Sequence, residues 1–268
     1  MGIVNVTPDS FSDGGMHLDA AAAILHGLAL ARAGAAIVDV GGESTRPGSD
    51  SVTAEVEAAR VVPVIAGLQQ AGIVISVDTS KALVALEAIA AGATMVNDVT
   101  ALRGDPDLLG VVRDRDVDVC LMHMQGTPRT MQDDPRYDDV VQEVCVFLQR
   151  RVEVAVAGGI SLSRITVDPG IGFGKTVDHN LALLAATERI AYATGCPVLI
   201  GVSRKRFLGS LIGGAERDRS SASLAAGLAA VERGAWMLRV HDVAPYADAL
   251  AVLRAIRTAE GVMTSSEH

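Results

Sequence analysis

Eight short apolar runs alternate along this chain with eight longer segments of helical periodicity. We predict strands in the apolar runs, at residues 2–6, 37–41, 74–78, 95–97, 119–122, 165–168, 198–201 and 237–240. Apolar residues recur at intervals of three and four in the segments between, which predicts helices at 18–33, 53–70, 81–91, 106–114, 138–157, 178–194, 221–233 and 244–260. Because crossover helices join parallel neighbours, this order predicts parallel strands in an α/β protein.

The number of strand–helix units decides between two parallel architectures. Eight units favour a closed (β/α)8 TIM barrel, and a doubly wound open sheet remains the alternative. The runs are mostly apolar on both faces, as burial between a core and a layer of helices requires. Since no linker or compositional break divides the chain, we expect one domain over residues 1–260 and a disordered tail over 261–268.

Charge and cysteine usage exclude several classes of partner. The formal net charge of −9 repels a phosphate backbone, so we expect no nucleic-acid partner. We also expect no membrane association, because no apolar stretch approaches the length of a membrane span and no export signal opens the chain. The three cysteines are widely spaced and lack a CxxC pattern, which disfavours disulfides and a zinc site. These features predict a cytoplasmic protein.

Polar residues collect at or just after the carboxyl ends of the predicted strands. They are Asn5, Asp39, Asp78, Asn97, His123, Asp168, Ser203, Arg239 and His241. In a parallel barrel these strand ends share one face, where the strand-to-helix loops converge and active sites form. Asp and Asn side chains can instead cap helices, but capping explains one or two such positions rather than a whole set. The pattern therefore predicts a binding site at this face.

The chemistry of this set indicates a flat, charged ligand. Carboxylate and amide groups suit the amino-pyrimidinone edge of a heterocycle, and they are supplied by Asp78, Asn97 and Asp168. Lys205 adds a point charge and Arg239 a planar group for stacking. A diphosphate would suit the group formed by Arg46, Arg239 and His241.

Three loops at this face complete the predicted site. Residues 7–15 and 41–50 are rich in Gly, Ser, Asp and Pro, and their composition is typical of turns or of a mobile lid. The stretch 170–176 is similar to a phosphate-binding P-loop, but Pro169 stands where the first glycine of that motif belongs. We interpret it as a flexible loop that displays Phe173 toward a ligand.

Eight blocks of this sequence resemble bacterial dihydropteroate synthases of the pterin-binding family. In chain order they are NVTPDSFSDGG (5–15), DVGGESTRPG (39–48), SVDTSK (76–81), VNDV (96–99), LMHMQGTPRTMQ (121–132), DPGIGFGKT (168–176), GVSRKRFLG (201–209) and RVHDV (239–243). The resemblance implies a transferase of folate biosynthesis. Such an enzyme condenses hydroxymethyl-dihydropterin diphosphate with p-aminobenzoate and yields dihydropteroate and pyrophosphate.

The resemblance also implies a role for individual residues. Catalytic roles fall to Asp78, Lys205, Arg239 and His241. The substrates would contact Thr45, Arg46, Pro47, Asp78, Asn97, Asp168, Phe173, Ser203, Lys205, Arg239 and His241. Within this set the p-aminobenzoate pocket comprises Pro47, Phe173 and Ser203. Sulfonamides imitate p-aminobenzoate, so the family implies a sulfonamide target. The family further implies Mg²⁺ as cofactor, placed with the help of Asn5, and a homodimer.

Two other functions stay open at this point. A methyltetrahydrofolate methyltransferase-like barrel also grips a pterin with carboxylates, but it has no use for cations that hold a diphosphate. A non-catalytic pterin-binding paralogue would share the fold without turnover. The groups at 203–205 and 239–241 count against the first alternative, and the complete set of matched polar positions counts against the second.

Overall fold

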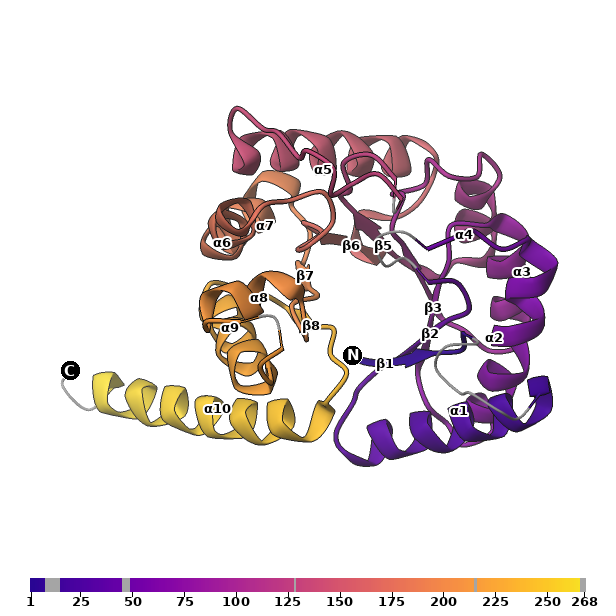
Figure 1. Cartoon of the computed structure of the whole chain (residues 1–268), viewed down its shortest axis with the longest axis horizontal. Coiled ribbons are helices and arrows are strands. Elements are labelled where there is room, and N and C mark those ends of the chain that lie inside the picture. The colour runs from indigo at the N-terminus through magenta and orange to yellow at the C-terminus, as the bar shows by residue number, and fades with distance from the viewer. Residues whose placement is uncertain (8–14, 45–48, 128, 215, 266–268) are drawn as a thin grey trace.

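The strands form a ring that the helices surround, as a computed structural model shows (Figure 1). The structure describes residues 1–7, 15–44, 49–127, 129–214 and 216–265, without the side chains of 15–19 and 260–265. The strands are β1 (Gly2–Asn5), β2 (Val38–Gly41), β3 (Ile75–Asp78), β4 (Met95–Asp98), β5 (Asp118–Met122), β6 (Ile165–Asp168), β7 (Leu199–Ile200) and β8 (Met237–Leu238). The helices are α1 (Gly15–Arg32), α2 (Ala54–Gln69), α3 (Ala82–Ala90), α4 (Leu108–Arg115), α5 (Val140–Ala157), the 3₁₀ turn η2 (Leu162–Arg164), α6 (Val177–Ala185), α7 (Thr187–Thr194), α8 (Arg206–Leu211), α9 (Ser220–Glu232) and α10 (Val243–Ser265).

Backbone pairing closes the ring. Strands β1 to β6 form one parallel sheet in sequence order, and β7 pairs with β8, also in parallel. Single bridges join the two sheets at both junctions, Val167 to Val198 and Gly2 to Val240. At the second junction the Ile3 N–H donates to the Val240 carbonyl at 3.0 Å. The predicted TIM barrel is therefore confirmed, and an open sheet, which would leave β1 as an edge, is excluded.

Alternation along the strands separates two apolar layers. Val119 and Leu121 of β5 pack in the large core between the barrel and the helices. Cys120, between them in sequence, faces the barrel interior and packs with Met95 and Leu199. Successive side chains of a strand point to opposite faces, so both faces must be apolar when both are covered. This accounts for the near-continuous apolar runs.

The structure differs from the predicted helices in three places. The helix predicted over 178–194 is split into α6 and α7 at Ala186, whose backbone leaves the helical region, and at this break the hydroxyl of the buried Thr187 donates to the Leu184 carbonyl at 2.9 Å. The short helix α8 is additional, and its Phe207 and Leu208 are buried. Helix α10 continues past residue 260 to Ser265, while 266–268 lie outside the described residues. No helix in the described part of the chain is long and apolar enough to cross a membrane.

Candidate active site

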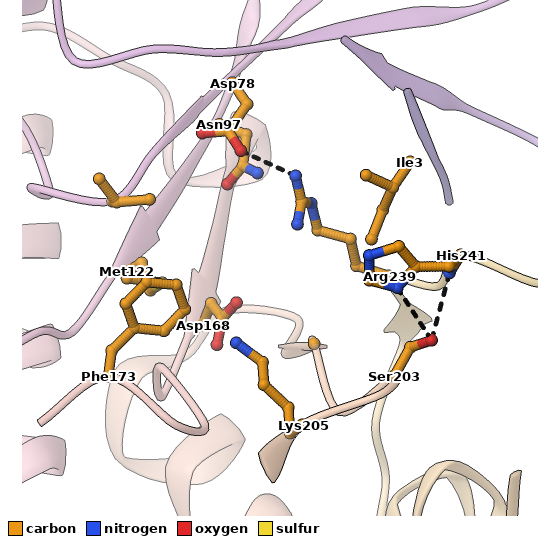
Figure 2. Close-up of a pocket in the computed structure, with 12 residues that line it drawn as sticks. Ile3, Asp78, Asn97, Met122, Asp168, Phe173, Ser203, Lys205, Arg239 and His241 are labelled. Carbon is orange, nitrogen blue, oxygen red and sulfur yellow. Dashed lines mark hydrogen bonds and ion pairs between the residues drawn. The ribbon is translucent and has the colours of Figure 1, made fainter. Parts of the chain in front are cut away.

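A cavity of about 70 Å³ lies at the carboxyl ends of the barrel strands (Figure 2). Strand register explains why distant residues meet there, since Gly41 pairs with Asp78, Asp78 with Asn97 and Met122 with Asp168. The walls include all the predicted substrate residues that the structure describes, namely Asp78, Asn97, Asp168, Phe173, Ser203, Lys205, Arg239 and His241.

Arg239 joins two carboxylates across the cavity. Its Nη2 donates to Asp78 Oδ2 at 2.7 Å, and its Nε donates to Asp39 Oδ2 at 2.6 Å. Burial lowers the pKa of Arg239, but Asp39 and Asp78 more than offset this effect and raise it above its ordinary value. Burial raises the pKa of Asp78 to about 7, against the opposing effect of the Arg239 charge. The Arg239 guanidinium therefore stays charged, whereas Asp78 can gain or lose a proton near neutral pH.

Asp168, Lys205 and Phe173 form the opposite wall. The Asp168 carboxylate accepts the Gly170 N–H at 2.6 Å, and Figure 2 shows the Lys205 ammonium pointing toward it. The Lys205 Nζ also lies 4.1 Å from the centroid of the Phe173 ring. Burial lowers the pKa of Lys205 to about 8, with Asp168 opposing the shift. Lys205 therefore remains mainly charged at neutral pH but can lose its proton at modest cost.

His241 and Ser203 form a pair at the rim. The His241 N–H donates to Ser203 Oγ at 3.2 Å, and the His241 Nδ1 lies 3.1 Å from the same oxygen. Burial lowers the pKa of His241 to about 4, and the guanidinium groups of Arg204 and Arg239 add to the shift. The imidazole is thus neutral at pH 7 before a ligand binds. It can donate a hydrogen bond to a phosphate but does not bring a charge.

Known proteins resemble this chain in both sequence and fold. The pterin binding enzyme family matches residues 1–241. This chain belongs to the pterin-binding enzymes. A dihydropteroate synthase of Neisseria meningitidis serogroup C is 48% identical over 259 residues, which cover 96% of this chain and 92% of the relative.

Solved structures of pterin-binding enzymes agree with this assignment. The dihydropteroate synthase of Xanthomonas albilineans, solved with 4-aminobenzoic acid, has a TM-score of 0.89 and 51% sequence identity, covering 96% of this chain and 92% of that one. The dihydropteroate synthase of Yersinia pestis, solved as a sulfonamide drug complex, has a TM-score of 0.90 at 43% identity, covering 96% and 94%. The resemblance seen in the sequence is confirmed, and the chain is a transferase related to these dihydropteroate synthases.

Some predicted residues are placed elsewhere or not described. Thr45, Arg46 and Pro47 lie outside the described residues. Asn5 ends β1 and is half-buried, and it is level with Gly41 and Asp78 in the strand register. Within the described ranges, no three His, Cys, Asp or Glu side chains are grouped so as to hold a metal ion.

Asp39 is a site residue that the sequence reasoning did not select beyond its place at a strand end. Its side chain is fully buried, and besides Arg239 it accepts the Asn97 Nδ2 hydrogen at 3.2 Å. Its second oxygen, Oδ1, is buried without a hydrogen-bond partner. A usable signal was present, because an Asp between Val38 and Val40 must face the barrel interior and needs a cation there.

Proposed function

We propose that this pterin-binding enzyme joins hydroxymethyl-dihydropterin diphosphate to p-aminobenzoate, releasing pyrophosphate and dihydropteroate for folate synthesis. The observation that carries the proposal is the cavity itself, where acids and an amide for a heterocycle lie beside cations for a diphosphate. The related dihydropteroate synthases, at 48% and 51% identity, support the same activity.

The pterin would lie against the acidic floor of the cavity. We assign the N–H groups of its pyrimidinone edge to Asp78, Asn97 and Asp168, which accept or exchange paired hydrogen bonds. The space of about 70 Å³ is smaller than a typical ligand pocket of ~300 Å³ or more. We therefore infer that Arg239 leaves Asp78 on binding and stacks over the ring, while Lys205 contacts the ring from the Asp168 side.

The diphosphate is the leaving group, and its charge must be balanced as the C–O bond breaks. Arg239 supplies a permanent positive charge, and neutral His241 supplies a hydrogen bond. Asn5 fits Mg²⁺, since a carboxamide oxygen is a hard ligand, and this ion takes few protein ligands and completes its shell with phosphates and water. When bound there, Mg²⁺ would neutralise further diphosphate charge.

Bond formation then needs positioning more than proton transfer. The electron-rich dihydropterin stabilises the positive methylene group left when the C–O bond breaks and diphosphate departs. The aniline nitrogen forms a bond to that carbon and then loses a proton to the released pyrophosphate or to water. A weakly basic aniline is already uncharged at neutral pH, so no strong general base is required. We assign the p-aminobenzoate ring to Phe173 and Ser203, which line the cavity, and to Pro47, which the family resemblance adds. We propose that sulfonamides bind at the same place. Orientation and charge would supply most of the rate.

One assay tests this function against the alternatives. We expect the purified chain to release pyrophosphate only when the pterin diphosphate, p-aminobenzoate and Mg²⁺ are all present, and EDTA to abolish the release. A methyltransferase-like barrel would release none, and a non-catalytic paralogue would bind the pterin without turnover. Release that did not depend on p-aminobenzoate would contradict the proposal.

We further propose that the protein is a cytoplasmic homodimer. The three described cysteines are free, which suits a reducing compartment. Figure 1 shows α10 extending beyond the barrel. Val252 and Ile256 on this helix are 60% and 52% exposed, and their spacing of four residues places them on one face, where we propose that the two chains meet.

Sedimentation equilibrium measures this association directly. We expect a mass near twice the 27.7 kDa of one chain, and a shift toward the monomer in Ile256→Glu. The matched control is Tyr192→Ser, which removes an exposed ring from α7. A monomeric wild type at micromolar concentration would exclude the dimer.

A further inference from the structure

Side chains hold the loop between β6 and α6 through hydrogen bonds to five backbone groups of residues 170–174. The sequence alone suggested a flexible loop, but the structure shows otherwise. The hydrogen bonds are Gly170 N to Asp168 Oδ1 (2.6 Å), Gly172 N to Asn180 Oδ1 (2.7 Å), Gln132 Nε2 to Gly172 O (2.7 Å), Lys175 Nζ to Phe173 O (2.9 Å) and Tyr137 Oη to Gly174 O (2.8 Å). The loop is therefore a fixed wall that carries Phe173.

Among the residues that hold the loop, Lys175 is the most unusual, because it is a buried lysine. Its side chain is only 3% exposed, although lysine is almost never fully buried unless it is paired. The Nζ lies 3.0 Å from His123 Nδ1 and 3.5 Å from the His123 carbonyl, besides its bond to Phe173 O. Burial lowers the pKa of Lys175 to about 7, against the opposing effect of Asp168, and in its protonated form the Nζ has three hydrogens for these three acceptors.

His123 is suited to accept from this lysine. Burial, together with the charge of the nearby Lys175, lowers the pKa of His123 to about 3, so the ring is neutral. Its Nδ1 can therefore accept a hydrogen bond. Phe147 packs against the edge of the same ring, with centroids 4.8 Å apart. The imidazole is a fixed support that connects the loop to β5.

The loop packs closely against the segment that follows β5. A Cβ added at Gly170 would come within 1.8 Å of the His123 carbonyl oxygen, and one at Gly174 within 2.8 Å of the Gln125 carbonyl oxygen. Backbone thus lies directly on backbone between this loop and the segment after β5. Lys175 Nζ bonds both sides of this contact, the Phe173 carbonyl and His123, so loss of its bonds would let the loop and the Phe173 ring move away from the segment after β5.

We propose that Lys175 is a positioning residue for the p-aminobenzoate side of the cavity, acting by holding Phe173 and its loop against His123. The inference rests on the proposed function, because it assigns Phe173 to that substrate. Lys175 does not line the cavity, so its effect passes through the loop rather than through contact with substrate.

Steady-state kinetics of Lys175→Met test this role, since methionine keeps the length of the stem but removes the charge and the donors. We expect the KM for p-aminobenzoate to rise by about tenfold, with smaller changes in kcat and in the KM for the pterin substrate. In the Phe173→Ala background, Lys175→Met should add little, because the ring that it positions is gone.

A second variant guards against misfolding. Tyr137→Phe removes one hydroxyl, and with it only the bond to Gly174 O, and should raise the same KM by about twofold to threefold. Its matched control is Tyr192→Phe, at a side chain that is 91% exposed, which should leave the kinetics unchanged.

Three outcomes of these measurements would contradict the role proposed for Lys175. The inference is overturned if Lys175→Met changes kcat and both KM values equally and in proportion to its loss of thermal stability, because the lysine would then be purely structural. It is also overturned if the effects of Lys175→Met and Phe173→Ala are additive. If Lys175→Met does not fold, an unchanged KM in Tyr137→Phe overturns it. A wild type that releases no pyrophosphate would instead overturn both proposals.

Discussion

Alanine in place of Arg239 is expected to lower kcat for pyrophosphate release by about 10²–10³-fold, the usual effect of removing one preorganised donor that stabilises developing charge. Arg239 is the cation whose charge is fixed at all relevant pH values, since its carboxylate partners hold its pKa above the ordinary value. His241 cannot replace that charge, because burial and neighbouring cations lower its pKa to about 4.

The same substitution should also reduce stability. From the sequence alone, Arg239→Ala would be expected to leave the fold intact. The structure changes that expectation, because the fully buried Asp39 would lose the guanidinium with which it pairs. Breaking a buried ion pair from one side typically costs about 3–5 kcal/mol. Burial already raises the pKa of Asp78 to about 7, so protonation of Asp78 would recover part of this, and the loss in the unfolding midpoint should be smaller at lower pH.

Arg164 provides a closely matched control. It also bridges two aspartates, Asp116 at 2.6 Å and Asp118 at 3.1 Å, but the three side chains are 35%, 76% and 53% exposed. They lie at the amino ends of β5 and β6, at the opposite rim of the barrel. Exposed pairs contribute at most about 1 kcal/mol, so Arg164→Ala should have nearly normal kinetics and stability. A rate for Arg239→Ala close to that of Arg164→Ala would contradict the assigned role.

The site was predictable where it follows strand ends. Asp78, Asn97 and Asp168 stand at the carboxyl ends of β3, β4 and β6, or one residue before, and a parallel barrel brings all strand ends to one face. Counting strand–helix units therefore gave both the fold and most of the cavity. The barrel closure at β7 and β8 was not readable in detail, because single bridges complete it where longer strands were predicted.

Contacts between loops and between distant strands were not predictable in the same way. The pair of Arg239 with Asp39 spans 200 positions in sequence, and it depends on the stagger of strands around the barrel. The bond from Lys175 to His123 depends on how two glycine-rich and polar segments pack. The local composition of both segments is typical of mobile loops, and only the tertiary contacts show that the loop between β6 and α6 is fixed.

Asparagine in place of Asp168 is expected to reduce kcat/KM for the pterin substrate by about 10³-fold or more, mainly through a higher KM. The change keeps the shape of a buried side chain but removes the negative charge and one acceptor that would face the ring, and sites built on paired hydrogen bonds discriminate by large factors. It also removes the charge that opposes the burial of Lys205.

The pH dependence of Asp168→Asn gives a second and independent readout. In the wild type the pKa of Lys205 is about 8, with Asp168 favouring the charged form. Loss of that carboxylate disfavours the ammonium, so the pKa must fall, and the alkaline limb of the pH–rate profile should move to lower pH. Asp98→Asn is the control, because Asp98 is also buried and accepts backbone N–H groups, from Thr100 and Leu102, without lining the cavity. Asp98→Asn should lower stability but change neither the KM for the pterin substrate nor the position of the alkaline limb. If the alkaline limb does not move in Asp168→Asn, the Asp168 carboxylate does not set the pKa of Lys205.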